Sequence, residues 1–152
     1  PKVANKKIII NNDINDFRSF NRFYTPFIGV LNKHYLNSKY SLPQSRVLHA
    51  IYVQEGITST EITALLNMDK SYLSRILIDF EKNKLVSKKE SSTDGRVVNL
   101  YLTKMGKKEF GKIDEASNKQ VKNLLLQLPE KERKKVIKCM SQIKKTLARY
   151  KF

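Results

Sequence analysis

Apolar residues recur three or four positions apart along much of the chain, which is the spacing of one helix face. The first such segment covers residues 13–37. Pro26 lies inside it and cannot donate a hydrogen bond to the carbonyl of Arg22, so we expect either a kink there or two helices that meet there. The apolar positions of this segment are Ile14, Phe17, Phe20, Tyr24, Phe27, Ile28, Leu31 and Tyr35.

Three more long helices are expected from the same spacing. One begins at Ser41, which can cap it, and should end at Gly56. Another starts at Lys104, and a last one opens at Pro129, because proline is favoured at a helix start. The positions expected to face inward in the last helix are Val136, Ile137, Met140, Ile143 and Leu147.

The centre of the chain predicts two short helices joined by a tight turn. Thr58 and Glu61 have the spacing of a capping box, which places one helix at residues 59–66. Asn67 tolerates the left-handed backbone that a turn requires, and Asp69 can cap a second helix over residues 70–83. This order is the helix-turn-helix plan.

A β-hairpin is expected directly after the second short helix. Residues 85–90 are typical of a strand, residues 91–95 of a polar turn, and apolar positions alternate with polar ones over residues 98–102. We therefore predict a mainly α fold with a small β-hairpin, in which a winged helix-turn-helix lobe at 41–103 is flanked by long helices at 13–40 and 104–151. The chain should form a single domain, 1–152.

The charge adds a functional indication. Thirty Lys and Arg residues face fourteen Asp and Glu residues, so the net charge is +16, which favours a polyanionic partner. Nucleic acid is the favoured partner and an anionic membrane is the second candidate. A general bias of the composition towards lysine gives the same balance of charges. The apolar runs are too short to span a bilayer, so we expect no membrane insertion and a cytoplasmic location.

Few residues of the sequence are suited to form a disulfide, ligate a metal or catalyse a reaction. One cysteine, Cys139, excludes an internal disulfide, and with His34 and His49 far apart we expect no metal site and no cofactor. A buried structural role is expected for Cys139, in preference to a redox sensor. His34 with Tyr35, and His49 with Tyr52, are candidates to line an effector pocket, but ordinary packing or surface exposure is favoured. The motifs of catalytic centres are absent from the sequence, so we do not expect an enzyme.

The second short helix carries the strongest candidates for a binding surface. Its apolar face leaves a group of polar side chains outside the core, near the helix end that enters a major groove in helix-turn-helix proteins. Arg75 can read guanine, whereas Lys70 suits phosphate. For each of these residues the alternative is an ordinary solvated surface side chain. For Tyr72, packing beside the wing is an equal alternative. The candidates on the two short helices are Ser59, Thr60, Lys70, Ser71, Tyr72, Ser74 and Arg75.

The hairpin supplies the remaining candidates. Lys88, Lys89 and Ser91 lie on its first strand and turn, and Arg96 follows the turn. An arginine at a wing tip can enter a narrow minor groove, and the carboxylate of Asp94 should hold the Arg96 guanidinium by a charge-assisted hydrogen bond. A polar turn with an incidental salt bridge is the alternative interpretation.

The order and spacing of these segments resemble the MarR family of transcriptional regulators, over about residues 13–151. The most specific part is the wing, where Asp94-Gly95-Arg96 is followed by a strand that ends in Leu102-Thr103 and by Gly106. The matching stretches are Thr58 to Leu66, Asn67-Met68-Asp69, Leu73-Ser74-Arg75, Asp79-Phe80-Glu81, Leu85-Val86, Asp94-Gly95-Arg96 and Leu100 to Thr103 with Gly106.

The resemblance implies a homodimer, joined by the helices at 13–40 and 104–151, that binds double-stranded DNA at a palindromic operator. It also implies a repressor, with an activator as the alternative, and a small-molecule effector that releases it. Within the family, the stretches at 17–24 and 72–75 are most similar to the N-terminal module of proteins that carry a GNAT acetyltransferase. The alternatives are therefore the regulatory module of such a fusion, if the gene continues past Phe152, or a protein-interaction adaptor on a winged fold.

Overall fold

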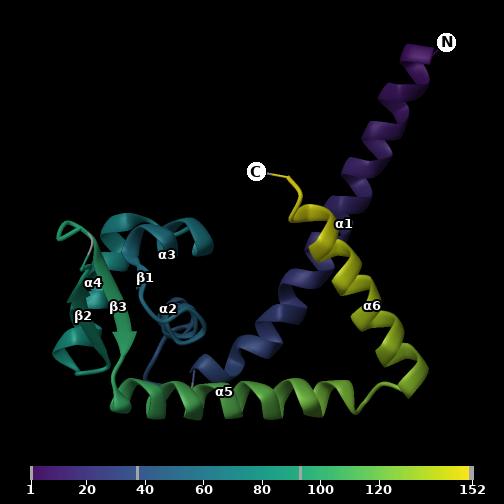
Figure 1. The fold of residues 1–152 in the computed structure, drawn as a ribbon. Helices are drawn as coiled ribbons and strands as arrows, with labels where there is room; N and C mark the ends of the chain where they lie inside the picture. The colour runs from purple at the N-terminus through teal and green to yellow at the C-terminus, as the bar shows by residue number, and fades with distance from the viewer. Residues whose placement is uncertain (1, 37, 93, 151–152) are drawn as a thin grey trace. The chain divides into compact units, whose positions relative to one another are not determined.

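The computed structural model describes residues 2–36, 38–92 and 94–150, and over this part of the chain it is predominantly helical, with one small sheet (Figure 1). Two compact units divide the chain, Pro1–Asp114 and Glu115–Phe152. The mainly α class with a β-hairpin, predicted from the sequence, is confirmed.

Helix α1 spans Lys2–Leu36 and is longer than the sequence pattern predicted. It begins eleven residues before residue 13 and continues through Pro26 as one element. The expectation of two helices meeting at Pro26 is therefore wrong. Aromatic side chains on the described part of α1 stack along its length, with the ring of Phe20 5.2 Å from Tyr24 and that of Phe23 6.4 Å from Phe27.

Helix α2 spans Leu42–Val53 and starts as predicted, because Ser41 forms a capping box with Gln44. Its end differs from the prediction. The helix stops at Val53, and Gly56 lies in the following turn with φ +84°, where its N–H donates to the carbonyl of Leu100 at 2.9 Å. Glycine is suited to that position because a positive φ costs it little.

The helix-turn-helix comprises α3, Ser59–Leu66, and α4, Lys70–Lys82. Asn67 between them is left-handed, with φ 46° and ψ 51°, as the sequence predicted. The sheet adds a strand that the sequence did not predict, β1 at Ile57–Thr58. It pairs antiparallel with β3, Val98–Leu102, which also pairs with β2, Val86–Glu90, giving the order β1-β3-β2.

One hydrophobic core joins these elements in the first unit. It is built from α2, α3, α4, the sheet and the start of α5, Lys104–Leu125. Gly106 of α5 lies so close to the chain before β2 that a Cβ added there would be 2.0 Å from the Leu85 carbonyl oxygen. The Thr103 hydroxyl strengthens this junction, since it donates to the carbonyl of Lys84 at 2.6 Å and accepts from the Gly106 N–H.

The second unit contains the end of α5 and helix α6, Glu130–Leu147. The apolar face predicted to point inward on α6 is exposed in the single chain, so that expectation is wrong. Cys139 is also exposed, in contrast to the buried role predicted for it. The residues of this apolar face of α6, with 39–49% of their surface exposed, are Val136, Ile137, Met140, Ile143 and Leu147.

Candidate nucleic-acid interface

The first two turns of α4 present polar side chains to solvent. Asp69 fixes the start of the helix, since its carboxylate accepts a hydrogen bond from the Tyr72 N–H at 2.9 Å. The opposite face of α4 is buried, with Phe80 fully enclosed in the core. The exposed surface is therefore held on a rigid helix. It consists, as predicted, of Lys70, Ser71, Tyr72, Ser74 and Arg75.

Two further candidates lie on helix α3. Ser59 and Thr60 are exposed in its first turn. The capping box below them is complete, because the Glu61 carboxylate accepts the Thr58 N–H at 2.8 Å and the Glu61 N–H donates to the Thr58 hydroxyl at 3.2 Å. Hydrogen bonds from the Thr58 backbone and side chain lower the pKa of Glu61, so this carboxylate stays charged at neutral pH.

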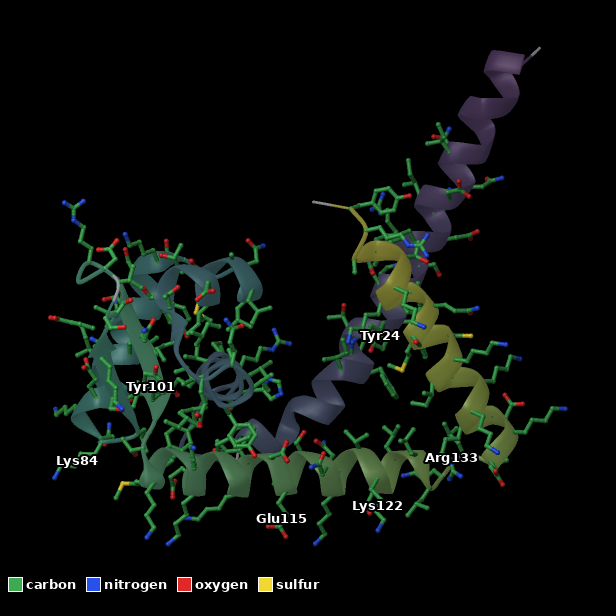
Figure 2. All side chains as sticks on the ribbon, in the orientation of Figure 1. Tyr24, Lys84, Tyr101, Glu115, Lys122 and Arg133 are labelled. Atoms are coloured by element: carbon green, nitrogen blue, oxygen red, sulfur yellow. The ribbon has the colours of Figure 1, made fainter. Side chains whose placement is uncertain are left out.

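The two lysines of the wing lie on opposite faces of the hairpin and have different partners. Lys88 forms a salt bridge with Glu81 of α4, with an Nζ–Oε2 distance of 2.6 Å. Lys89 lies over the ring of Tyr101, with its Nζ 5.1 Å from the ring centre (Figure 2 labels Tyr101). Glu81 was not anticipated as a partner, since a pairing between a helix and the next strand follows no sequence periodicity.

The turn of the wing corrects one prediction. Asp94 does not pair with the Arg96 guanidinium within the described residues; its carboxylate accepts the Arg96 backbone N–H at 3.0 Å. Asp94 therefore shapes the turn and leaves the Arg96 side chain exposed, without an ion pair to the residues that the structure describes. Ser91 is half-buried, and its N–H closes the turn by donating to the carbonyl of Val97 at 2.8 Å.

Comparison with known proteins agrees with this geometry. Residues 39–97 match the model of the MarR family. This stretch, which is less than half of the chain, is similar to the MarR family. The match covers the helix-turn-helix and the wing up to Arg96 and Val97, so it contains all twelve residues predicted to form the interface.

Solved structures share the fold of this chain. Streptococcus pneumoniae FabT in complex with DNA has a TM-score of 0.76 at 20% identity, covering 89% of this chain and 99% of that one. The Staphylococcus aureus MepR–DNA complex has a TM-score of 0.67 at 20% identity, covering 86% and 96%. A MarR transcriptional regulator from Methanosarcina mazei Go1 has 0.69 at 16%, covering 85% and 93%. A search of curated proteins gave no match.

Other candidate sites receive little support from the structure. His49 and Tyr52 pack against Phe110, with ring centres 5.8 Å and 4.5 Å apart, so both contribute to packing beside α5. The side chain of His34 lies outside the described residues. A cluster of three metal-ligating side chains is not found in the part of the chain that the structure describes. Among the same residues, none of the helices is long and apolar enough to cross a membrane.

The basic charge lies mainly outside the winged lobe. Residues 41–103 carry eight basic and seven acidic side chains, a net charge of +1. Residues 115–152 carry eleven basic and three acidic side chains, a net charge of +8. Half of the excess positive charge that suggested a polyanionic partner therefore belongs to residues 115–152, and the candidate interface depends on a few placed cations instead.

Proposed function

We propose that this chain is a sequence-specific, double-stranded DNA-binding transcriptional regulator of the MarR family. The observation that carries the proposal is the exposed polar surface of α4, presented by a helix whose other face is locked into the core. A helix of this kind enters the major groove with its N-terminal end. The two neighbours whose structures are DNA complexes support the same assignment.

Each part of the interface has a proposed role. Arg75 is free of ion pairs within the described residues and can bond guanine O6 and N7, while Ser71, Ser74 and Tyr72 bond bases or phosphates. Lys70 contacts phosphate, as do Ser59 and Thr60 from α3. Arg96 enters the minor groove, and Lys88, Lys89 and Ser91 contact the flanking backbone, with Asp94 shaping the turn.

We also propose that the regulator is a homodimer. Large apolar side chains are exposed on α6 and on α1, where Phe17 is 59% and Phe23 is 68% exposed. Exposed apolar helix faces are typical of protein–protein contacts. A two-fold dimer would present two α4 helices about 34 Å apart, which matches successive major grooves and a palindromic operator. From the family resemblance we further infer a repressor that a small-molecule effector releases.

Titration of genomic DNA fragments at two salt concentrations tests this function. Arg75→Ala should weaken the tightest fragments about 5- to 150-fold, which corresponds to about 1–3 kcal/mol. Arg96→Ala should weaken binding and lower the salt slope by about one. Lys82→Ala removes an equal charge from the far end of α4 and is the matched control. An adaptor that reuses the winged fold predicts no effect of Arg75→Ala.

A further inference from the structure

Ile78 is an exposed aliphatic side chain on the polar side of helix α4. It has 60% of its surface exposed, although isoleucine is among the residue types that are most often buried. The other aliphatic side chains of α4 belong to the hydrophobic core. Ile78 therefore lies outside the packing that holds α4 in place. The buried aliphatic residues of α4 are Leu73, Ile76 and Leu77.

Helical geometry places Ile78 near the middle of the surface that is proposed to contact DNA. At about 100° per residue, Ser71, Arg75 and Ile78 all lie within about 30° of the direction opposite the buried face. Along the helix axis, Ile78 lies about 4.5 Å beyond Arg75 and about 12 Å beyond Lys70. A major groove about 12 Å wide can admit a helix over this length. Ile78 therefore belongs to the same row as the side chains that are proposed to read bases.

The neighbours of Ile78 on the helix surface are polar. Residues three and four positions away are neighbours on a helix. At these positions α4 has Ser74, Arg75, Glu81 and Lys82. A single aliphatic side chain among polar ones differs from the contiguous apolar patches that mark protein–protein contacts. Such surroundings suit a polar groove that contains a few small apolar groups.

The base edges in the major groove of DNA offer one apolar group, the C5-methyl group of thymine. The other groups are hydrogen-bond donors and acceptors, which an aliphatic side chain cannot bond. Burial of one methyl group contributes a factor of about four to an equilibrium constant. Phosphates along one strand are about 3.4 Å apart, so a side chain about 4.5 Å beyond Arg75 can meet a base one or two pairs from the guanine assigned to Arg75.

We propose that Ile78 is a specificity-determining residue, whose side chain contacts the C5-methyl group of a thymine close to the base pair that Arg75 reads. The inference rests on the proposed function, since it requires that α4 enters the major groove. Arg75 then selects guanine by hydrogen bonds, while Ile78 selects thymine by an apolar contact. Cytosine that is methylated at C5 carries the same group, and the experiment separates the two sources.

The test compares thymine with uracil in a duplex that the full-length chain has selected from a random, unmethylated library. Deoxyuridine pairs as thymine does and lacks only the C5-methyl group, so each replacement removes one methyl group. Replacement at one or more positions should weaken wild-type binding about 3- to 5-fold. Ile78→Ala should weaken binding to the thymine duplex about 5- to 20-fold and reduce the thymine-to-uracil affinity ratio at those positions to below about 1.5. Ile78→Val keeps a branched apolar side chain and should keep the ratio.

Leu65→Ala is the matched control. Leu65 is 65% exposed on α3, and its substitution removes as many carbon atoms as Ile78→Ala does. The control should leave the thymine-to-uracil ratio unchanged. Salt dependence gives a second readout, because an apolar contact releases no counterions. Ile78→Ala should therefore keep the wild-type slope of log K against log salt, whereas Arg96→Ala lowers it.

A wild-type chain that selects an operator, yet binds every uracil duplex as tightly as the thymine duplex, would overturn this inference and leave the proposed function standing. A ratio that survives Ile78→Ala would also overturn it, since the methyl group would then contact another residue. If only C5-methylation of a cytosine tightens binding, and Ile78→Ala abolishes that gain, the assignment to thymine is wrong and the ligand is 5-methylcytosine. A wild-type chain that prefers no sequence would contradict the proposed function itself, and this inference with it.

Discussion

The ring of Tyr40 lies edge-on to Phe80, with ring centres 6.3 Å apart and an interplanar angle of 81°. Phe80 belongs to α4, whereas the Tyr40 hydroxyl donates to Glu109 of α5 at 3.3 Å. Glu109 in turn pairs with Lys39 at 3.0 Å and with Lys112 at 2.7 Å. Tyr40 therefore links the buried side of α4 to the helix that leads into the C-terminal unit.

Removal of the Tyr40 hydroxyl tests this link. Tyr40→Phe keeps the edge-on ring contact and deletes one hydrogen bond to a charged acceptor, so the free energy of unfolding should fall by about 1–2 kcal/mol. Urea denaturation of the first unit measures this change in the free energy of unfolding. Tyr72→Phe is the matched control on the exposed surface of α4 and should change stability by less than about 0.5 kcal/mol. Equal effects of the two substitutions would contradict the link.

Glu109 predicts a pH dependence of stability. Hydrogen bonds from Lys112 and Lys39 lower the pKa of its carboxyl from 4.5 to about 2 in the folded chain. A lowered folded pKa stabilises the protein above the unfolded value, and this contribution is lost as the pH falls from about 4.5 towards 2. Denaturation at pH 6, 5, 4 and 3 should show wild type losing more stability than Glu109→Gln. Parallel curves for the two proteins would refute this role.

Two glycines of α5 predict opposite responses to alanine. A Cβ at Gly106 meets the Leu85 carbonyl oxygen, a backbone atom that is also held by the Thr103 N–H, so Gly106→Ala should destabilise the chain by about 1–3 kcal/mol or more. A Cβ at Gly111 meets nothing within 4 Å, and alanine favours helix, so Gly111→Ala should stabilise by about 0.5–1 kcal/mol. Thermal unfolding of both variants provides the measurement.

The helix-turn-helix could be predicted closely from local sequence signals. The capping box of Thr58 and Glu61 fixed the start of α3, and Asn67 and Asp69 fixed the turn and the start of α4. These signals depend on neighbouring residues alone. The exposed polar side of α4 followed from helical periodicity, because the core positions of the helix leave Lys70 and Arg75 outside.

The remaining features depend on contacts that no local pattern records. Strand β1 has two residues, and its pairing of Ile57 with Leu100 joins positions far apart in sequence. Val136 and Ile143 were expected to face inward because an apolar helix face was assumed to pack into the chain's own core. In the single chain this face is exposed. The Asp94 prediction failed because the short side chain reaches the Arg96 backbone more readily than its guanidinium.

The most direct test of the central claim is the specificity ratio. This ratio is the affinity for a duplex selected from a random library divided by the affinity for the scrambled sequence of the same duplex, both measured at one fixed salt concentration. A sequence-reading regulator predicts a wild-type ratio of about 10³ or more and a selected duplex with inverted repeats. Arg75→Ala should reduce this ratio about 5- to 150-fold, while Lys82→Ala should leave it unchanged. A wild-type ratio near one, or a ratio that Arg75→Ala does not change, would contradict the account.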